Sequence, residues 1–135
     1  MRLKSYQTQI CRTQGRLFEL AGKRDLDDDE FVKAFMNSET ARQLDMPWSH
    51  AQWAGEAYLL AELKDEVHSL PESPHGYRPD AMYWMGYIYR YWHFYTGESS
   101  AEIYEHADAS TMAIAYPGYH TLDCAQAIDR LLEDD

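Results

Sequence analysis

The stretch from Asp80 to Gly97, DAMYWMGYIYRYWHFYTG, constrains the fold more than any other part of the chain. Eight of its 18 residues are Phe, Trp or Tyr. Placed at 100° per residue, apolar side chains fall on nearly every side, and a helix that is apolar all round is normally covered all round. The stretch is too short for a membrane span, which needs about 20 apolar residues, and Arg90 and His93 interrupt it. We therefore predict the central helix of a soluble fold over residues 80–97.

One narrow stripe of this predicted helix is different in character. Gly86, Arg90, His93 and Gly97 follow one another at spacings of 4, 3 and 4. In one interpretation the stripe meets a buried acidic partner, and Arg90 is held by a carboxylate and stacks on aromatic rings. In the other interpretation it faces outward, where it is open to a ligand or a partner. The sequence leaves both open.

The remaining segments predict further helices and no strand. Apolar residues at steps of three and four indicate a helix over about residues 2–21 that stops near Gly22. Later helices are predicted at about 28–37, 39–44, 48–67, 100–106, 109–116 and 122–134. Their predicted N-caps are Asp27, Ser38, Ser49, Ser99 in a capping box with Glu102, Asp108 and Thr121. We predict an all-α single domain, residues 1–135, with five to seven helices around residues 80–97 and a loop at 68–79.

Small residues in the predicted 48–67 helix indicate its neighbour. Ala54, Ala57 and Ala61 would let another helix approach closely, and large residues on one side of a contact favour small ones opposite. The aromatic helix is the expected neighbour. Glu56 or Glu62 would then reach Arg90.

The net charge of −11 is unevenly divided. Residues 1–24 carry six basic residues and one acidic residue, whereas the rest of the chain carries six basic and 22 acidic residues. Either the basic first helix docks across an acidic body and the charges largely cancel, or a negative surface is available to a cationic partner. A nucleic-acid binder would show a basic face beyond one helix, so we expect no direct binding of nucleic acid.

Catalytic and metal-binding motifs are absent from the sequence. It has no GxSxG, HExxH or phosphate-binding glycine loop, and Cys11 and Cys124 lack zinc or disulfide spacing. His68 and His75 lie in a loop without further ligands, so we predict no metal and no cofactor. His120 with Asp123 has the residue types of a general base and its orienting group, but Thr121 and Asp123 also suit a helix N-terminus. We predict no catalytic residue.

The aromatic content favours binding of another protein. Eleven Tyr and four Trp are many for a core alone, because each buried O–H or N–H must find a partner. Tyr, Trp and Arg also dominate interface energetics. The predicted partner-binding residues are Tyr87, Arg90, Tyr91, Trp92, His93, Tyr95, Tyr119 and His120.

Three pieces of the second half carry a family resemblance: YWMGYIYRYW, TGESSAEIY and GYHTLD. Over residues 80–133 the chain resembles small bacterial helical proteins from loci suspected to be toxin–antitoxin or mobile-element defence modules. The resemblance implies a cytoplasmic accessory protein that neutralises a neighbouring toxin. It implies no catalytic residues.

We therefore expect a non-catalytic, acidic protein-binding module, antitoxin-like or inhibitor-like, whose partner has a basic cleft, such as a toxin or a nucleic-acid-processing enzyme. Acidic surface would speed the encounter, and Trp, Tyr and Arg would supply contact energy. One alternative is a phage- or plasmid-borne inhibitor that imitates nucleic acid. A second is a small enzyme that uses His120, Arg90 and His93. A homodimer through the aromatic patch is also open.

Overall fold

The computed structural model describes residues 1–73 and 76–133, which form a single all-α domain. Within these residues no strand occurs beyond an isolated bridge between Leu26 and Glu72. The helices are α1 (Ser5–Lys23), α2 (Asp28–Met36), α3 (Glu39–Asp45), η1 (His50–Trp53), α4 (Glu56–Val67), α5 (Pro79–Thr96), α6 (Ser100–His106), α7 (Ala109–Tyr119) and α8 (Cys124–Glu133), of which η1 is a 3-10 turn. The predicted all-α class is confirmed.

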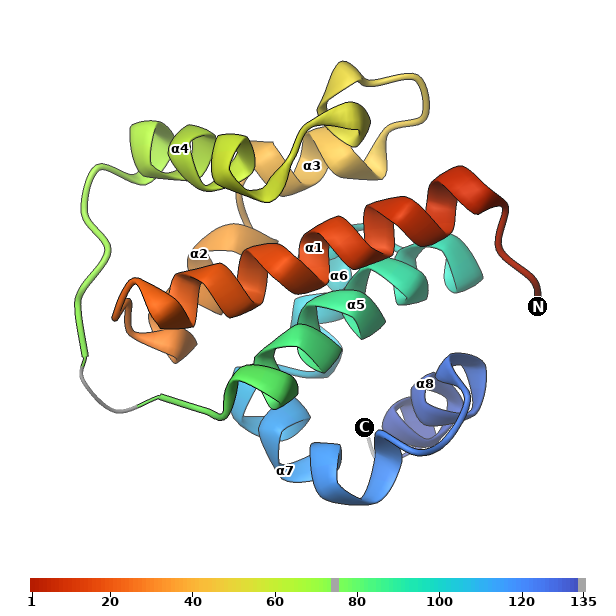
Figure 1. Cartoon of the computed structure of the whole chain (residues 1–135). Coiled ribbons are helices and arrows are strands. Elements are labelled where there is room, and N and C mark those ends of the chain that lie inside the picture. Colours follow the sequence, from red (N-terminus) through yellow and green to blue (C-terminus); the bar gives the residue numbers. More distant parts are fainter. Residues whose placement is uncertain (74–75, 134–135) are drawn as a thin grey trace.

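Helix α5 lies at the centre of the domain. Proline at its first position and Gly97 after its last residue delimit it, and Gly97 adopts the left-handed conformation with φ 81°. Helix α1 lies along one side of α5, and α6, α7 and α8 cover its other sides (Figure 1). Met85, Ile88 and Trp92 are at most 1% exposed. The all-round apolar character of this stretch is thus matched by all-round cover.

Two glycines bring α1 and α5 close together. A Cβ atom at Gly86 of α5 would lie 2.5 Å from the backbone oxygen of Gln14 and 2.8 Å from the Phe18 ring. On α1, a Cβ atom at Gly15 would lie 2.9 Å from the Tyr83 ring. These distances are below normal contact, so both positions require glycine for this packing. Gly86 belongs to the stripe that the sequence set apart, and its role is close helix packing.

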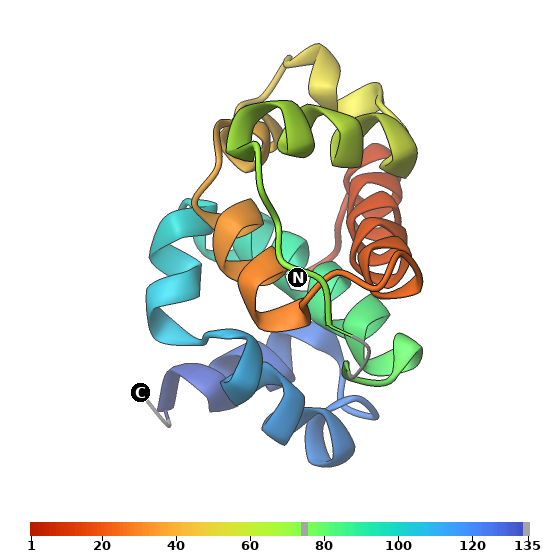
Figure 2. The ribbon, with the colours of Figure 1, turned by 90° about the vertical axis from the view of Figure 1, so that its left-hand side faces the viewer.

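The prediction of one long helix over residues 48–67 is wrong. Ser49 caps only the short turn η1, and the chain is then extended at Ala54 and Gly55 before α4 begins. Helix α4 packs on α1 and α3, where it forms an upper layer with α3 (Figure 2). Ala57 and Ala61 are exposed, so the predicted contact between these alanines and the aromatic helix is also wrong.

Most of the predicted N-caps are confirmed. The side chains of Asp27, Ser38, Ser99 and Asp108 accept hydrogen bonds from backbone N–H groups of the helices that follow, and Ser99 forms the capping box with Glu102.

The last two helices begin and end elsewhere than predicted. Helix α7 continues through Pro117 to Tyr119 because proline there interrupts only the final turn. Helix α8 begins at Cys124, and Asp123 instead of Thr121 accepts the Gln126 N–H at 3.0 Å. The predicted end of the last helix at Asp134 lies outside the described residues.

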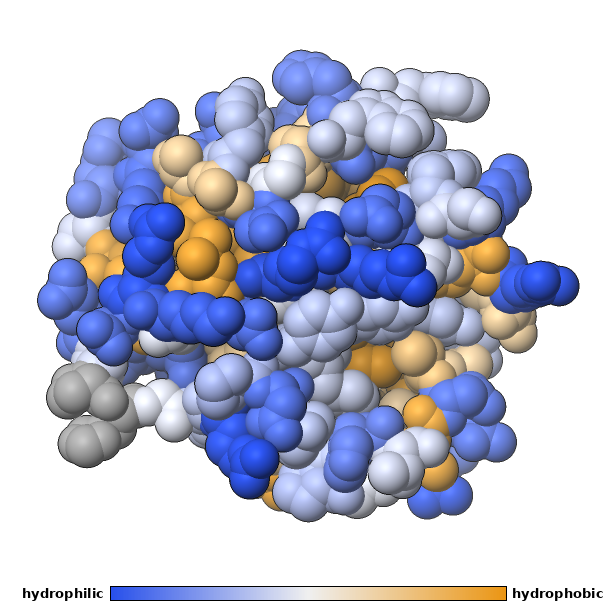
Figure 3. All heavy atoms as spheres, viewed as in Figure 1, coloured by the Kyte–Doolittle hydropathy of each residue, from blue (hydrophilic) through white to orange (hydrophobic). Residues whose placement is uncertain are grey.

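The basic face of α1 remains at the surface. A hydrophilic row of side chains runs along this helix in Figure 3, and Arg12, Lys23 and Arg24 are exposed. Among the described residues, the ion pair between Arg16 and Glu56, at 3.5 Å, is the one that links α1 to another helix. The positive charge of α1 is therefore largely presented to solvent.

Within residues 1–73 and 76–133, no helix combines the length and the apolar character that crossing a membrane requires.

Candidate functional site

Arg90 of α5 lies in a buried polar network and is 0% exposed. Its Nη1 donates to Asp45 Oδ1 at 2.6 Å, and its Nε donates to Gln14 Oε1 at 2.8 Å. A third bond runs from Nη2 to Ser100 Oγ at 3.2 Å. The stripe on α5 therefore meets a buried acidic partner, as the first of the two interpretations has it.

The acidic partner is Asp45, the last residue of α3, and not Glu56 or Glu62. Besides Arg90, the Asp45 carboxylate accepts the Ser100 N–H at 2.9 Å and the Ser100 O–H at 2.7 Å. A carboxylate at the C-terminal end of a helix is disfavoured by the helix dipole. That unfavourable position was the available sequence signal for Asp45, because a neighbouring cation would offset it.

His93 and Trp92 are tied to the turn between α5 and α6. The His93 Nδ1 atom lies 2.6 Å from the backbone oxygen of Glu98 and 3.7 Å from Asp45 Oδ1. The Glu98 carboxylate accepts the Trp92 indole N–H at 3.1 Å and lies 2.8 Å from His106 Nε2. These contacts hold the α5–α6 turn, and they use the polar atoms that a partner would otherwise meet.

Three of the predicted partner-binding residues belong to the core. Arg90 and Trp92 are fully buried, and Tyr91 is 9% exposed, with its O–H donated to the Met1 carbonyl at 3.2 Å. They are enclosed because α1 and α6 to α8 surround α5. Tyr87 and Tyr95 are half-buried, and the Tyr95 hydroxyl donates to Asp129 at 2.9 Å. The centre of the predicted contact surface is therefore buried.

The predicted residues at the end of α7 are more accessible. Tyr119 is half-buried and His120 is exposed. The His120 ring stacks on Tyr116 at 4.5 Å, and its Nδ1 lies 2.8 Å from the Tyr116 carbonyl oxygen. Asp123 caps α8. Arg90 and His93 meet at Asp45, and His120 is not part of that cluster.

Exposed aromatic residues occur instead between α3 and α4. Trp48 is 96% exposed and Trp53 is 76% exposed, and the Tyr6 ring of α1 lies 6.5 Å from that of Trp53. They line a groove with a volume of about 250 Å³. We name it the Trp48/Trp53 groove, and it is lined by Lys4, Tyr6, Pro47, Trp48, Gln52 and Trp53.

The backbone of Trp48 is held in an uncommon conformation. Its φ is 72°, a region that bulky residues rarely adopt. This conformation directs the indole ring to solvent directly after Pro47. Sequence reasoning missed this groove because it placed Trp48 and Trp53 within one continuous helix over residues 48–67. Pro47 followed by Trp48 and the polar residues 49 and 50 was the signal for a surface loop.

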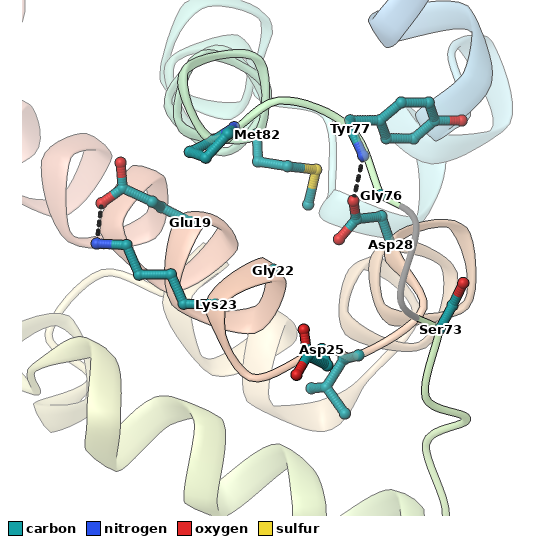
Figure 4. A pocket seen from close by; sticks show the side chains of 11 residues that line it. Glu19, Gly22, Lys23, Asp25, Asp28, Ser73, Gly76, Tyr77 and Met82 are labelled. Atoms are coloured by element: carbon teal, nitrogen blue, oxygen red, sulfur yellow. Dashed lines mark hydrogen bonds and ion pairs between the residues drawn. The ribbon is translucent and has the colours of Figure 1, made fainter.

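A second hollow lies between the end of α1, the start of α2 and residues 76–82 (Figure 4). Its volume is about 160 Å³. Asp28 lines it and is 4% exposed, and burial raises the pKa of its carboxyl group. The sequence predicted Asp27 as a helix cap, which is confirmed, but it gave no sign that Asp28 is buried.

Among the described residues, no group of three or more His, Cys, Asp or Glu side chains is placed to hold a metal ion. His75, one of the two histidines considered for a metal, lies outside those residues. Burial raises the pKa of the Cys11 thiol to about 12, so this cysteine is not a reactive thiolate at neutral pH.

Comparison with protein-family models, curated proteins and solved structures finds no match to the chain.

Proposed function

We propose that this protein is a non-catalytic binding module that grips a partner protein through the Trp48/Trp53 groove. The observation that carries the proposal is the exposure of Trp48, at 96%, together with its φ of 72°. A residue held in a rare backbone conformation indicates a functional position. A Trp side chain left in water forgoes its burial energy, and Trp is the residue most enriched in binding hot spots.

The groove favours a different protein over a second copy of this chain. Its polar lining residues are Lys4 and Gln52, and α1 adds exposed Arg12 beyond it. A two-fold contact through the groove would bring the same positive charges together. A partner segment with apolar side chains and a neighbouring carboxylate would fill the groove and pair with Lys4.

An antitoxin-like or inhibitor-like role is part of this proposal. The net charge of −11 would attract a partner whose remaining surface is basic, such as a toxin or a nucleic-acid-processing enzyme with a basic cleft. The partner would be neutralised when the module covers that cleft. This role also agrees with the cytoplasmic setting that the resemblance of residues 80–133 implies.

The proposal is tested by comparing capture and affinity among three variants. Immobilised wild-type protein, Trp48→Ala, Trp53→Ala and Ile114→Ala are exposed to lysate of the source organism, and the enriched protein is then titrated by calorimetry. Ile114 is the matched control because it is 79% exposed and lies on α7, outside the groove. We expect each Trp variant to lose at least about tenfold in affinity and Ile114→Ala to stay within about twofold. Equal capture by wild-type protein and Trp48→Ala would contradict the proposal.

A second candidate is imitation of nucleic acid by an acidic face. The pKa of Tyr104 is raised by burial and then by the charges of Asp108, Asp29 and Glu30, so carboxylates from the N-cap of α7 and from α2 lie near one hydroxyl group. Such a face would dock in a basic cleft without the aromatic groove. Substitution of the three carboxylates by amides would then abolish binding and its salt dependence, whereas Trp48→Ala would change neither.

A further inference from the structure

The pocket beside Asp28 shares no lining residue with the Trp48/Trp53 groove. Three segments build it: Glu19 and Gly22 come from the last turns of α1, Asp28 from the first turn of α2, and Gly76 and Tyr77 from the segment that precedes α5. The protein-binding proposal does not use any of these residues.

The Asp28 carboxylate has one satisfied and one unsatisfied oxygen. Its Oδ2 accepts the Tyr77 N–H at 2.6 Å. Its Oδ1 is buried and, within the described residues, has no hydrogen-bond partner. Figure 4 shows this oxygen on the side of the carboxylate that faces Gly22 and Asp25. Buried polar atoms are nearly always paired, so an unpaired carboxylate oxygen directed into a pocket indicates a missing donor.

The surrounding charges also call for a cation. Glu19 and Asp25 line the same pocket, and burial raises the pKa of Asp28, with further contributions from Asp27 and Asp29. Lys23 also lines the pocket, but it pairs with Glu19 at 3.4 Å, its side chain is 64% exposed, and it points away from Asp28 (Figure 4). Lys23 therefore offsets the charge of Glu19 and not that of Asp28.

We propose that this pocket binds a small cation with N–H donors, a primary ammonium or guanidinium group, and that Asp28 is its anchor. One N–H donor would pair with Oδ1 in a charge-assisted hydrogen bond. The volume of about 160 Å³ exceeds what a single water molecule needs, so it admits such a group with a short alkyl stem. A divalent metal ion fits less well because the described residues offer no cluster of three metal-ligating side chains.

The pocket is tested by titration of the protein with n-propylammonium and methylguanidinium, followed by ¹H–¹⁵N NMR of the backbone amides. We expect saturable shifts at Gly22, Gly76 and Tyr77. Tetramethylammonium, a cation without N–H donors, should leave them unchanged. Absence of saturable shifts with either N–H cation, or equal shifts with tetramethylammonium, would overturn the proposal.

Two isosteric substitutions separate the anchor from general charge. Asp28→Asn removes the charge beside the pocket, and we expect at least about a tenfold loss of affinity. Asp29→Asn makes the same charge change at the adjacent residue. Its carboxylate is exposed, accepts a hydrogen bond from the Tyr77 hydroxyl and does not line the pocket. This control should stay within about twofold of the wild-type protein. Equal losses in the two variants would overturn the assignment of Asp28.

A third variant distinguishes loss of the site from loss of the fold. At Gly22 an added Cβ would lie 3.7 Å from Asp28 Oδ1, in the space that the cation would occupy. Since Gly22 is a helical residue of α1, Gly22→Ala should raise the midpoint of thermal unfolding by roughly 1–3 °C. It should also weaken binding severalfold. Unchanged cation affinity in this more stable variant would count against the site.

Titrations with two peptides and with divalent metal ions show whether the cation belongs to a partner protein or is a free small molecule. If the group belongs to a partner protein, an arginine-containing peptide should bind at least about tenfold more tightly than methylguanidinium, and its citrulline counterpart should not bind. Equal affinity of peptide and methylguanidinium would identify a free small cation. Stronger shifts at the same amides with Mg²⁺ or Ca²⁺ would overturn the proposal in favour of a metal site.

Discussion

The chain has two aromatic-rich regions that differ in the exposure of their rings to solvent. In α5 the rings of Tyr89, Tyr91 and Trp92 are at most 9% exposed. In the segment from Met46 to Tyr58, Trp48 is 96% exposed and Trp53 is 76% exposed. Helices surround α5, whereas the η1 segment lies at the edge of the domain beside the start of α1 (Figure 1). The same residue types therefore serve packing in one region and remain free for contact in the other.

The difference arises from helical phase and backbone geometry. In α5 an unbroken helix distributes apolar residues around its axis, so that each side meets a neighbouring helix. Between α3 and α4 the helix is interrupted at Trp48, by its positive φ, and again at Ala54 and Gly55. Without a continuous helix, the aromatic residues there have no common inward face. Aromatic content alone thus does not indicate which rings are buried.

The largest expected difference in the free energy of unfolding is between two tryptophan variants, one from each region. Trp92→Ala removes a fully buried side chain and should lower the free energy of unfolding by about 3–5 kcal/mol. Trp53→Ala removes a side chain that is 76% exposed and should change it by less than about 0.5 kcal/mol. Urea denaturation followed by circular dichroism measures both. Similar losses in the two variants would mean that Trp53 is part of the core and would remove the contrast.

The next largest effect on the free energy of unfolding is expected at the buried ion pair between Arg90 of α5 and Asp45 of α3. Asp45→Ala leaves Arg90 charged, 0% exposed and without its carboxylate, which should cost about 3 kcal/mol or more in the free energy of unfolding. Replacing both residues, as Asp45→Leu with Arg90→Met, should cost less than Asp45→Ala alone because no unpaired charge remains. A double variant that is less stable than either single variant would show that the pair adds net stability beyond charge compensation.

The sequence predicted the features of the fold that depend on local patterns. The all-α class, the position of α5 and the caps at Asp27, Ser38, Ser99 and Asp108 follow from periodicity and from the chemistry of helix ends. The neighbour of α5 was missed because close helix packing depended on Gly15 and Gly86 and not on a row of alanines. Spacing shows which residues share a face of one helix, but it does not show which other helix covers that face.

The candidate site was predictable only in part. That Arg90 needs an acidic partner could be inferred from the stripe on α5, but Asp45 lies 45 residues earlier in the chain and reaches it only through tertiary packing. The groove at Trp48 depends on a positive φ at a residue type that rarely adopts it. Arg90 and Trp92 are buried and cannot contact a partner, because the neighbouring helices cover the sides of α5 on which these two residues lie.

The third expected effect is a gain in stability when the exposed residue Trp48 is replaced by glycine. Trp48→Gly removes the steric conflict of a positive φ, but glycine also makes the unfolded chain more flexible, so we expect a net gain below about 1 kcal/mol in the free energy of unfolding. Affinity for the partner should fall at the same time. Trp48→Ala, which keeps a Cβ atom, is the control and should show no gain. A loss of stability in Trp48→Gly would mean that the indole packs on the domain.

The smallest expected effect is a change of stability with pH that depends on Asp28, the first residue of α2. Burial raises the pKa of this carboxyl group in the folded state above its ordinary value of 3.8. The folded protein therefore holds the proton more tightly than the unfolded chain does, and stability is lost as pH rises from 3.8 through the raised pKa. Relative to Asp28→Asn, the wild-type protein should lose stability by less than about 1 kcal/mol between pH 4 and pH 7, measured by urea denaturation with Asp29→Asn as reference.

Saturating n-propylammonium should reduce this loss, because a bound cation compensates the charge that the fold leaves unpaired. If the wild-type protein instead gained stability over Asp28→Asn as pH rises, the carboxylate would already have a cationic partner within the chain, and the pocket would have no unmet charge to offer a ligand.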